Sequence, residues 1–252
     1  MPRQPRPESV VMVISEQAEK HQSTDVQDPA PQRHAALTQA LAGAVGRPLT
    51  RCTGLPGTAG VTEIRRAITT ARDTLITYTA GGILRTEAGH LALRSSTELA
   101  KPAQTLRLNG LAEAVNQATA LRKLQIHDLR AGPDLWSSVA EEPEFLGLSG
   151  PSTAVIGHLR VANHEGHSIT HSHTWTELLT CILRDGVRGT GPEMTLEALA
   201  KSFPQVRSLS SDHSQIRVRS GKNWLPMANR ASVTSRSLSG TPRSNFQPQS
   251  PD

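Results

Sequence analysis

The chain has 252 residues, with 27 Lys or Arg, 22 Asp or Glu and a formal net charge of +5. Only seven residues are aromatic (three Trp, one Tyr and three Phe), so Leu, Val, Ile and Ala must supply most of the core. No stretch approaches the about 20 apolar residues of a membrane span, and two cysteines are too few for a four-cysteine zinc site or a disulfide framework. We therefore expect a soluble protein of the cytoplasm or nucleus, with a modest core and no membrane partner.

Hydrophobic periodicity predicts helices and short strands in mixed order. Helices are predicted over 35–45, 61–79, 83–93, 111–121, 126–139, 174–185 and 195–203, with an interruption at Gly132-Pro133 in segment 126–139. Strands are predicted over 105–108, 153–161 and 214–220. Helix 174–185 has the clearest boundaries, because Thr174 and Glu177 form a capping box and Gly186 follows the last apolar residue. This order predicts an α+β fold with a small mixed core of helices and short strands, of which a winged-helix-like unit is one form.

Composition divides the chain into three parts. Residues 1–59 are rich in Pro, Gln, Glu and Ser and are expected to be largely disordered. Residues 60–226 carry the periodic segments and are expected to form the α+β core. Residues 227–252 are rich in Ser and Arg and are expected to form a basic, disordered tail.

Basic side chains gather toward the C-terminal end. Residues 207–252 contain seven Lys or Arg and two Asp, so this stretch accounts for the whole net charge. Arg217 and Arg219 share one face of strand 214–220, and Lys222 and Arg230 follow. Such a surface is typical of proteins that contact RNA or another polyanion, and these four residues are the candidate nucleic-acid contacts. The alternative is an edge strand protected by its charge, followed by a solvated tail.

Histidines cluster where strand 153–161 ends. Five of the ten histidines lie within residues 158–173. His164, His167, His171 and His173 are close enough in sequence to bind zinc together, although their spacing matches no common zinc pattern. The alternative is a surface loop in which histidine has no function.

A resemblance to a known family runs through the same residues. Residues 162–168 read Ala-Asn-His-Glu-Gly-His-Ser and resemble the Arg-Ala-Asn-Gln-Gly-His-Ser motif of the tRNA 2′-phosphotransferase family. Residues 182–187 and 211–218 resemble two further segments of that family, and the resemblance covers about residues 73–235. It implies a winged-helix domain and an enzyme that transfers a splice-junction 2′-phosphate from tRNA to NAD. The residues that match its active site are Arg85, Arg160 and His167.

Several family positions are not matched. Thr86 stands where the family has His, and Glu144 precedes Phe145 where the family has Arg. Binding a 2′-phosphate needs fixed positive charge and paired donors. Our leading hypothesis is therefore a non-catalytic protein that contacts RNA or another polyanion; a degenerate relative of this family is one form of it. The alternatives are an active NAD-dependent phosphotransferase and a protein that binds zinc through its histidine cluster. No oligomeric state is predicted.

Overall fold

The computed structural model describes residues 9–15, 30–54, 58–94, 106–141, 152–161, 175–203, 214–222, 224 and 226–231. The strands are β1 (Ser9–Ser15), β2 (Thr50–Gly54), β3 (Thr74–Arg85), β4 (Leu91–Leu93), β5 (Arg122–Ala131), β6 (Thr153–Val161), β7 (Glu193–Met194), β8 (Ser214–Arg219) and β9 (Met227–Ala228). The helices are α1 (Ala30–Val45), α2 (Thr58–Thr70), α3 (Leu108–Gln117), α4 (Pro133–Glu141), α5 (Trp175–Asp185) and α6 (Leu196–Ser202).

Seven of the described strands form one sheet, in which β2, β1, β3, β5, β6 and β8 lie in that order. The first five run parallel, and β8 pairs antiparallel with β6 at one edge. β4 turns back antiparallel against the end of β3, while β7 and β9 form a separate two-stranded sheet. Strand order reverses at β1, since β2 lies on one side of it and β3 on the other.

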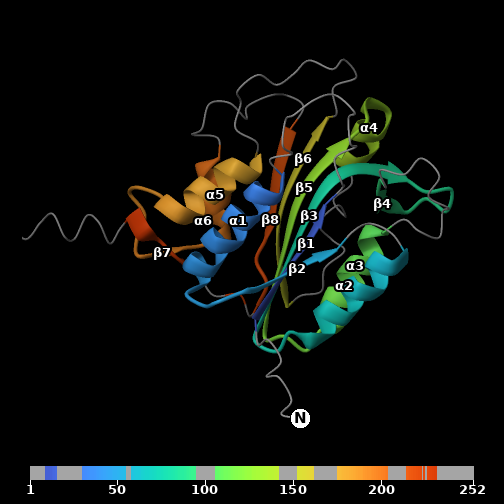
Figure 1. The fold of residues 1–252 in the computed structure, drawn as a ribbon. Helices are drawn as coiled ribbons and strands as arrows, with labels where there is room; N and C mark the ends of the chain where they lie inside the picture. The colour runs from blue at the N-terminus through green and yellow to red at the C-terminus, as the bar shows by residue number, and fades with distance from the viewer. Residues whose placement is uncertain are drawn as a thin grey trace, which may run out of the picture.

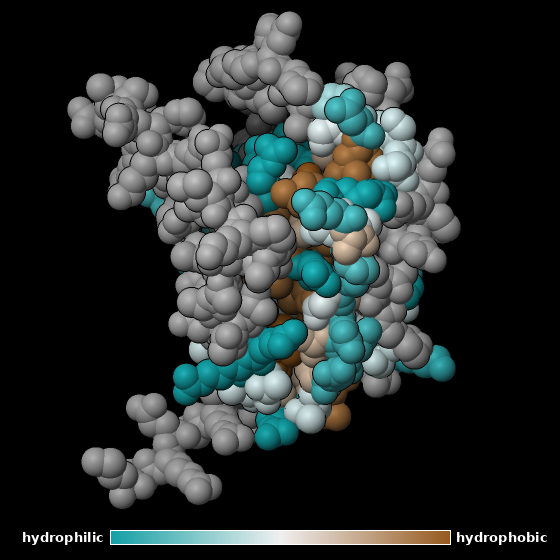
Figure 2. Space-filling view, turned by 90° about the vertical axis from the view of Figure 1, so that its right-hand side faces the viewer, coloured by the Kyte–Doolittle hydropathy of each residue, from teal (hydrophilic) through white to brown (hydrophobic). Residues whose placement is uncertain are grey.

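Helices cover both faces of this sheet, as Figure 1 shows. One core lies between the sheet and α2, α3 and α4, and includes Ile64, Leu111 and Val139. The other lies between the sheet and α1, α5 and α6, and includes Leu41 and Leu179. Figure 2 shows the α2–α4 side from outside, where hydrophilic side chains predominate among the described atoms and a strip of hydrophobic ones shows between them. No helix in the described ranges is long and apolar enough to cross a membrane.

Because helices cover both faces, the central parallel strands β1, β3, β5 and β6 are buried almost throughout. All five residues from Val10 to Ile14 in β1 are at most 2% exposed. In β3, Thr74 to Thr79 are likewise buried. Such strands read as continuous runs of β-branched and apolar residues without the alternation of a half-exposed strand.

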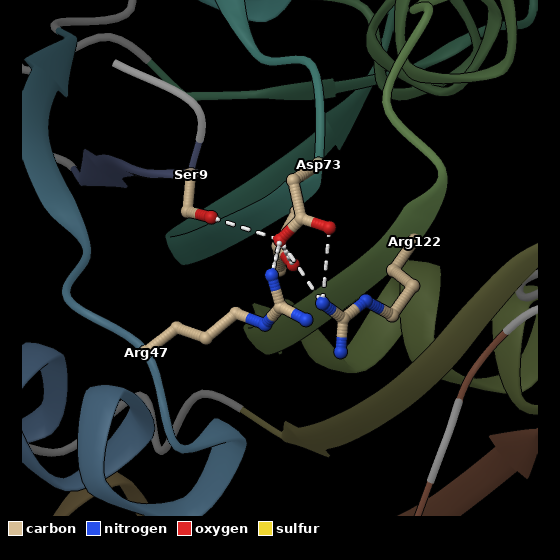
Figure 3. Close-up of polar contacts among 5 residues, drawn as sticks. Ser9, Arg47, Asp73 and Arg122 are labelled. Carbon is tan, nitrogen blue, oxygen red and sulfur yellow. Dashed lines mark hydrogen bonds and ion pairs between the residues drawn. The ribbon is translucent and has the colours of Figure 1, made fainter.

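The amino ends of three parallel strands are joined by one carboxylate. Asp73 accepts hydrogen bonds from Ser9 Oγ (3.1 Å), Thr74 Oγ1 (2.9 Å) and Arg47 Nη1 (2.9 Å). Arg122 Nη2 lies 3.0 Å from each of its two oxygens (Figure 3). Ser9, Thr74 and Arg122 are register partners at the starts of β1, β3 and β5. Asp73 therefore fixes the alignment of these strands at the end opposite their carboxyl termini.

A second set of hydrogen bonds holds the loop between α5 and β7. The buried side chain of Asn229 accepts a hydrogen bond from Val187 N (2.9 Å) and donates to oxygens of Val187, Thr190 and Gly191. Gly186 ends α5 with φ of 81°. A Cβ at that position would collide with Asn229 and with the backbone of Ala231, so only glycine fits.

The α+β class expected from the sequence is confirmed, and the described core is a large, mostly parallel sheet between helices. The structure also places β1, α1 and β2 inside residues 1–59, where the sequence predicted a largely disordered segment. These elements bury their own apolar residues against the sheet, so part of the core lies outside the predicted 60–226 boundaries.

Several predicted elements were wrong. Helix 61–79 is correct only up to Thr70, because the segment from Thr74 to Thr79, which is rich in β-branched residues, forms β3. Residues 83–93 end β3 and form β4 rather than a helix, and 126–139 splits into β5 and α4. In the described part of segment 105–108, residues 106–108, the strand-like pairing is a single bridge from Arg107 to Ala92. Strands β6 and β8 and helices α5 and α6 agree with the predictions.

Candidate functional site

The carboxyl ends of β1, β3, β5 and β6 meet at one edge of the sheet, because these strands are parallel. In open α/β sheets, ligands bind in the crevice outside this edge. Alternation along β5 and β6 puts Asp128, Arg130, His158 and Arg160 on the same face as Ile126 and Ile156, which pack against the α1/α5 layer. We call these four residues, together with Tyr78 and Thr176, the carboxyl-edge cluster.

Two arginines lie side by side at the top of this cluster. Arg130 on β5 and Arg160 on β6 are register partners. Arg130 is exposed and Arg160 is half-buried. No hydrogen bond or ion pair joins Arg160 to any other residue in the described ranges. Burial lowers the pKa of Arg160, the Asp128 carboxylate raises it, and the charge of Arg130 lowers it again, with a net decrease.

A buried hydrogen-bonded chain lies beneath the arginines. One carboxylate oxygen of Asp128 is hydrogen-bonded to His158 Nδ1 at 3.1 Å, and the other accepts a hydrogen bond from Thr176 Oγ1 at 2.8 Å. Tyr78 Oη lies 2.6 Å from Thr176 Oγ1. Because Thr176 has one hydroxyl hydrogen and gives it to the carboxylate, Tyr78 must be the donor in this last bond. All four side chains are at most 9% exposed.

The hydrogen-bonded side chains keep the buried carboxylate of Asp128 ionised. Burial raises the pKa of Asp128, but the hydrogen bond and charge of His158, the charge of Arg160 and the hydrogen bond of Thr176 lower it by more. Asp128 is therefore an ionised carboxylate that binds the first turn of α5 to the sheet.

Stacked aromatic rings cover these hydrogen-bonded side chains on the side of α5 and α6. Trp175 stacks on His158, with ring centroids 5.5 Å apart, and on Phe203, at 5.4 Å. The amino-terminal part of α1 approaches from the other side, where the ring of His34 meets that of Tyr78 edge-on at 5.6 Å. Both helices thus present their amino ends, which carry partial positive charge, to the carboxyl edge. Arg33 on α1 adds a further cation, 3.8 Å from Glu177.

The arrangement favours binding over nucleophilic catalysis. In a hydrolase triad, a histidine accepts the proton of the attacking hydroxyl and an acid orients that histidine. Here Asp128 lies between His158 and Thr176, so the hydroxyl proton points at the carboxylate. The Thr176 oxygen is also occupied by Tyr78. The hydroxyl of Thr176 therefore has a structural role. The guanidinium groups of the two arginines above it have the donor geometry to bind a phosphate or carboxylate.

The structure separates two of the residues that the family resemblance singles out. Arg85 donates to Gly89 O (3.0 Å) in its own hairpin and to Ser138 Oγ (3.4 Å) of α4. It thus lies on the α4 side of the sheet, while Arg160 lies on the α1/α5 side. His167 is outside the described residues. Arg85 and Arg160 therefore do not line one described site.

The predicted zinc ligands His164, His167, His171 and His173 also lie outside the described residues. Within the described ranges, no three His, Cys, Asp or Glu side chains are grouped as metal ligands would be.

The basic candidates of the C-terminal third do not form one surface. Arg217 and Arg219 are half-buried on β8, and Arg217 donates to Gln215 Oε1 at 3.1 Å. Lys222 is exposed beyond the end of that strand. Arg230 lies against Gly43 of α1, in the helical layer on the opposite face from Arg217.

Sequence reasoning missed Asp128 and Arg130, because residues 126–139 read as a helix. The signal was a buried run from Leu124 to Leu129 that ends in charged residues, as the carboxyl end of a parallel strand at a binding edge often does. No family model matches this chain, and no curated protein resembles it significantly. The fold and site define an α+β protein with an open, mostly parallel sheet and two neighbouring arginines at its carboxyl edge.

Proposed function

We propose that this chain is a non-catalytic protein that binds RNA through the carboxyl edge of its sheet, with Arg160 and Arg130 as phosphate contacts. The observation that carries the proposal is a half-buried guanidinium, that of Arg160, with no hydrogen bond or ion pair among the described residues. Another positive charge, that of Arg130, lies at the paired position on β5.

Placing a cation in partly desolvated surroundings beside another cation is unfavourable unless an anion compensates. Asp128 supplies part of that compensation, but its two oxygens are already bonded to His158 and Thr176. A phosphate oxygen outside the edge could accept from both arginines, with the planar donor geometry that guanidinium offers.

The surrounding charges support an anionic ligand. The amino ends of α1 and α5, which carry partial positive charge, lie at the same edge, where Arg33 is paired with Glu177. The chain as a whole carries +5, all of it from residues 207–252. Net positive charge raises the rate and strength of association with a polyanion.

RNA binding is tested by the fluorescence anisotropy of a labelled single-stranded RNA at fixed, moderate salt. We expect Arg160→Gln to weaken binding about tenfold, since one charged phosphate contact is worth roughly 1.5 kcal/mol. Arg66→Gln removes an exposed arginine from α2, on the other side of the sheet, and should change binding less than about twofold. Equal effects of the two substitutions would reject the carboxyl edge as the site. Heparin that competes fully with the RNA would indicate a general polyanion site.

An active NAD-dependent 2′-phosphotransferase has less support, because Arg85 and Arg160 lie on opposite faces of the sheet. Incubation with NAD and an RNA that carries an internal 2′-phosphate should leave that phosphate in place. Multiple turnovers in this assay would overturn the non-catalytic proposal.

A further inference from the structure

A second unusual group of side chains lies on the opposite face of the sheet, at its centre. Thr77 and Thr79 on β3 face the α2–α4 layer, as do Gln125 and His127 on β5. Thr77 pairs in register with Gln125, and Thr79 with His127. The four polar side chains therefore form one compact block on two neighbouring strands.

This block is fully inside the protein. Thr77 and Thr79 are 0% exposed, Gln125 is 2% exposed and His127 is 8% exposed. Met12 and Ile14 of β1 flank it on one side. On the other side, Gly157 of β6 pairs with His127 and contributes no side chain. Strands buried on both faces ordinarily carry apolar residues at such positions.

Three polar atoms of this block have no hydrogen-bond partner among the described residues: Thr77 Oγ1, Thr79 Oγ1 and Gln125 Nε2. Each such atom costs roughly 1–3 kcal/mol when it is buried without a partner, and native proteins contain few of them. Three adjacent ones are better explained by a shared partner than by three independent penalties.

The shared partner must be uncharged. The block contains two hydroxyls, an amide and an imidazole, and burial lowers the pKa of His127 to about 4. His127 is therefore neutral at physiological pH, and no side chain of the block would compensate a charged ligand. Hydroxyls and an amide can donate to or accept from a neutral group, as an internal water does with about three bonds.

We infer that Thr77, Thr79 and Gln125 line an internal binding site for a neutral hydrogen-bonding ligand, either ordered water or a small uncharged polar molecule. This site is separate from the carboxyl edge and does not depend on RNA binding.

The stability of Thr→Val variants tests the site. Thr153 is also 0% exposed, and its hydroxyl donates to Asn116 Oδ1 at 3.0 Å, so Thr153→Val calibrates the loss of a satisfied buried hydroxyl. We expect both Thr77→Val and Thr153→Val to lower the Tm, each by about 2–4 °C. Thr77→Val together with Gln125→Met should lower the Tm by less than the two single changes add up to, because both contact one ligand.

Two readouts on the wild-type protein identify the ligand. Water-to-amide cross-peaks in NMR at residues 77, 79 and 125 would identify ordered water. A neutral compound released on denaturation and detected by mass spectrometry would identify a small molecule, and adding it back should raise the Tm. The inference is overturned if Thr77→Val raises the Tm while neither readout shows a ligand, since the hydroxyl would then be unsatisfied.

Discussion

Arg130 and Arg160 occupy the same register position on the neighbouring strands β5 and β6, and their side chains leave the same face of the sheet. Neighbouring strands lie about 4.8 Å apart, so the two positively charged side chains extend from backbone positions that are close together. Positions of this kind are tolerated when they serve binding and not stability.

The free protein should therefore become more stable when Arg160 loses its charge. Arg160→Met keeps most of the side-chain volume and removes a half-buried cation, so we expect unfolding free energy to rise by about 1 kcal/mol. Urea denaturation measures this change. Arg66→Met, at an exposed position on α2, should stay within about 0.5 kcal/mol of wild type. Marked destabilisation by Arg160→Met would mean that the arginine supports the fold.

Asp73 should control stability in acid. Partial burial raises the pKa of Asp73, but hydrogen bonds from Arg122, Thr74 and Ser9 and the charge of Arg122 lower it by more, so its folded pKa lies below the ordinary value. Its contribution is then present above the unfolded pKa of about 3.9 and is lost as pH falls through the folded pKa. Asp73→Asn should cost about 2 kcal/mol at pH 7 and much less at pH 2.

Asp185 provides a matched comparison for Asp73. The pKa of Asp185 is also lowered, by its hydrogen bond with Arg184, but both partners of that pair are 60% exposed. Asp185→Asn should therefore cost less than about 0.5 kcal/mol at either pH. Equal costs for the two substitutions would show that Asp73 does not align the strands.

Tyr78 should remain un-ionised until the protein unfolds. Burial raises the pKa of Tyr78 and the Asp128 carboxylate raises it further, giving a large net increase. Tyr78 is the protein's single tyrosine, so absorbance near 295 nm during an alkaline titration reports on it alone. Stability from this shift is complete below the unfolded pKa of about 10 and declines above it.

The absorbance rise should therefore coincide with the loss of the far-ultraviolet circular dichroism signal. Ionisation near pH 10 in a protein that is still folded would contradict the buried chain from Tyr78 to His158.

Asn229 should hold the loop from Val187 to Gly191. Asn229→Ala removes the hydrogen bonds of a side chain that is 1% exposed, and leaves the carbonyl groups of Val187 and Gly191 without this donor. We expect a cost of about 2–3 kcal/mol and faster amide exchange at Val187. Asn109→Ala, at a half-buried position in α3, serves as the control and should cost less than half as much.

Local signals predicted some elements correctly. Helix α5 has an amphipathic pattern and is followed by a glycine, and the side chains of β6 and β8 alternate in character. Residues that are close in sequence are therefore enough to predict these elements. β3 and β5 lie at the centre of the sheet, where both faces are buried and alternation disappears. Their apolar residues also fit a helical period, which is why Leu75 and Ile126 were assigned to helices.

The candidate site could be predicted only in part. Arg160 stands out in the sequence because it ends a clear strand. Its relation to Arg130 depends on the pairing of β5 with β6, which joins residues 30 positions apart. Thr176 and Tyr78 come from still more distant segments. Contacts of this kind follow from strand order, which local periodicity does not contain.

The salt dependence of RNA binding tests the central claim most directly. Affinity should fall as salt rises, because neutralised phosphates release counterions. The slope of log affinity against log salt should be smaller by about 2 in Arg130→Gln/Arg160→Gln than in the wild-type protein, about 1 for each lost phosphate contact. An unchanged slope and affinity in this double variant would contradict the carboxyl-edge site. Wild-type binding that does not weaken with salt would contradict the electrostatic mechanism as a whole.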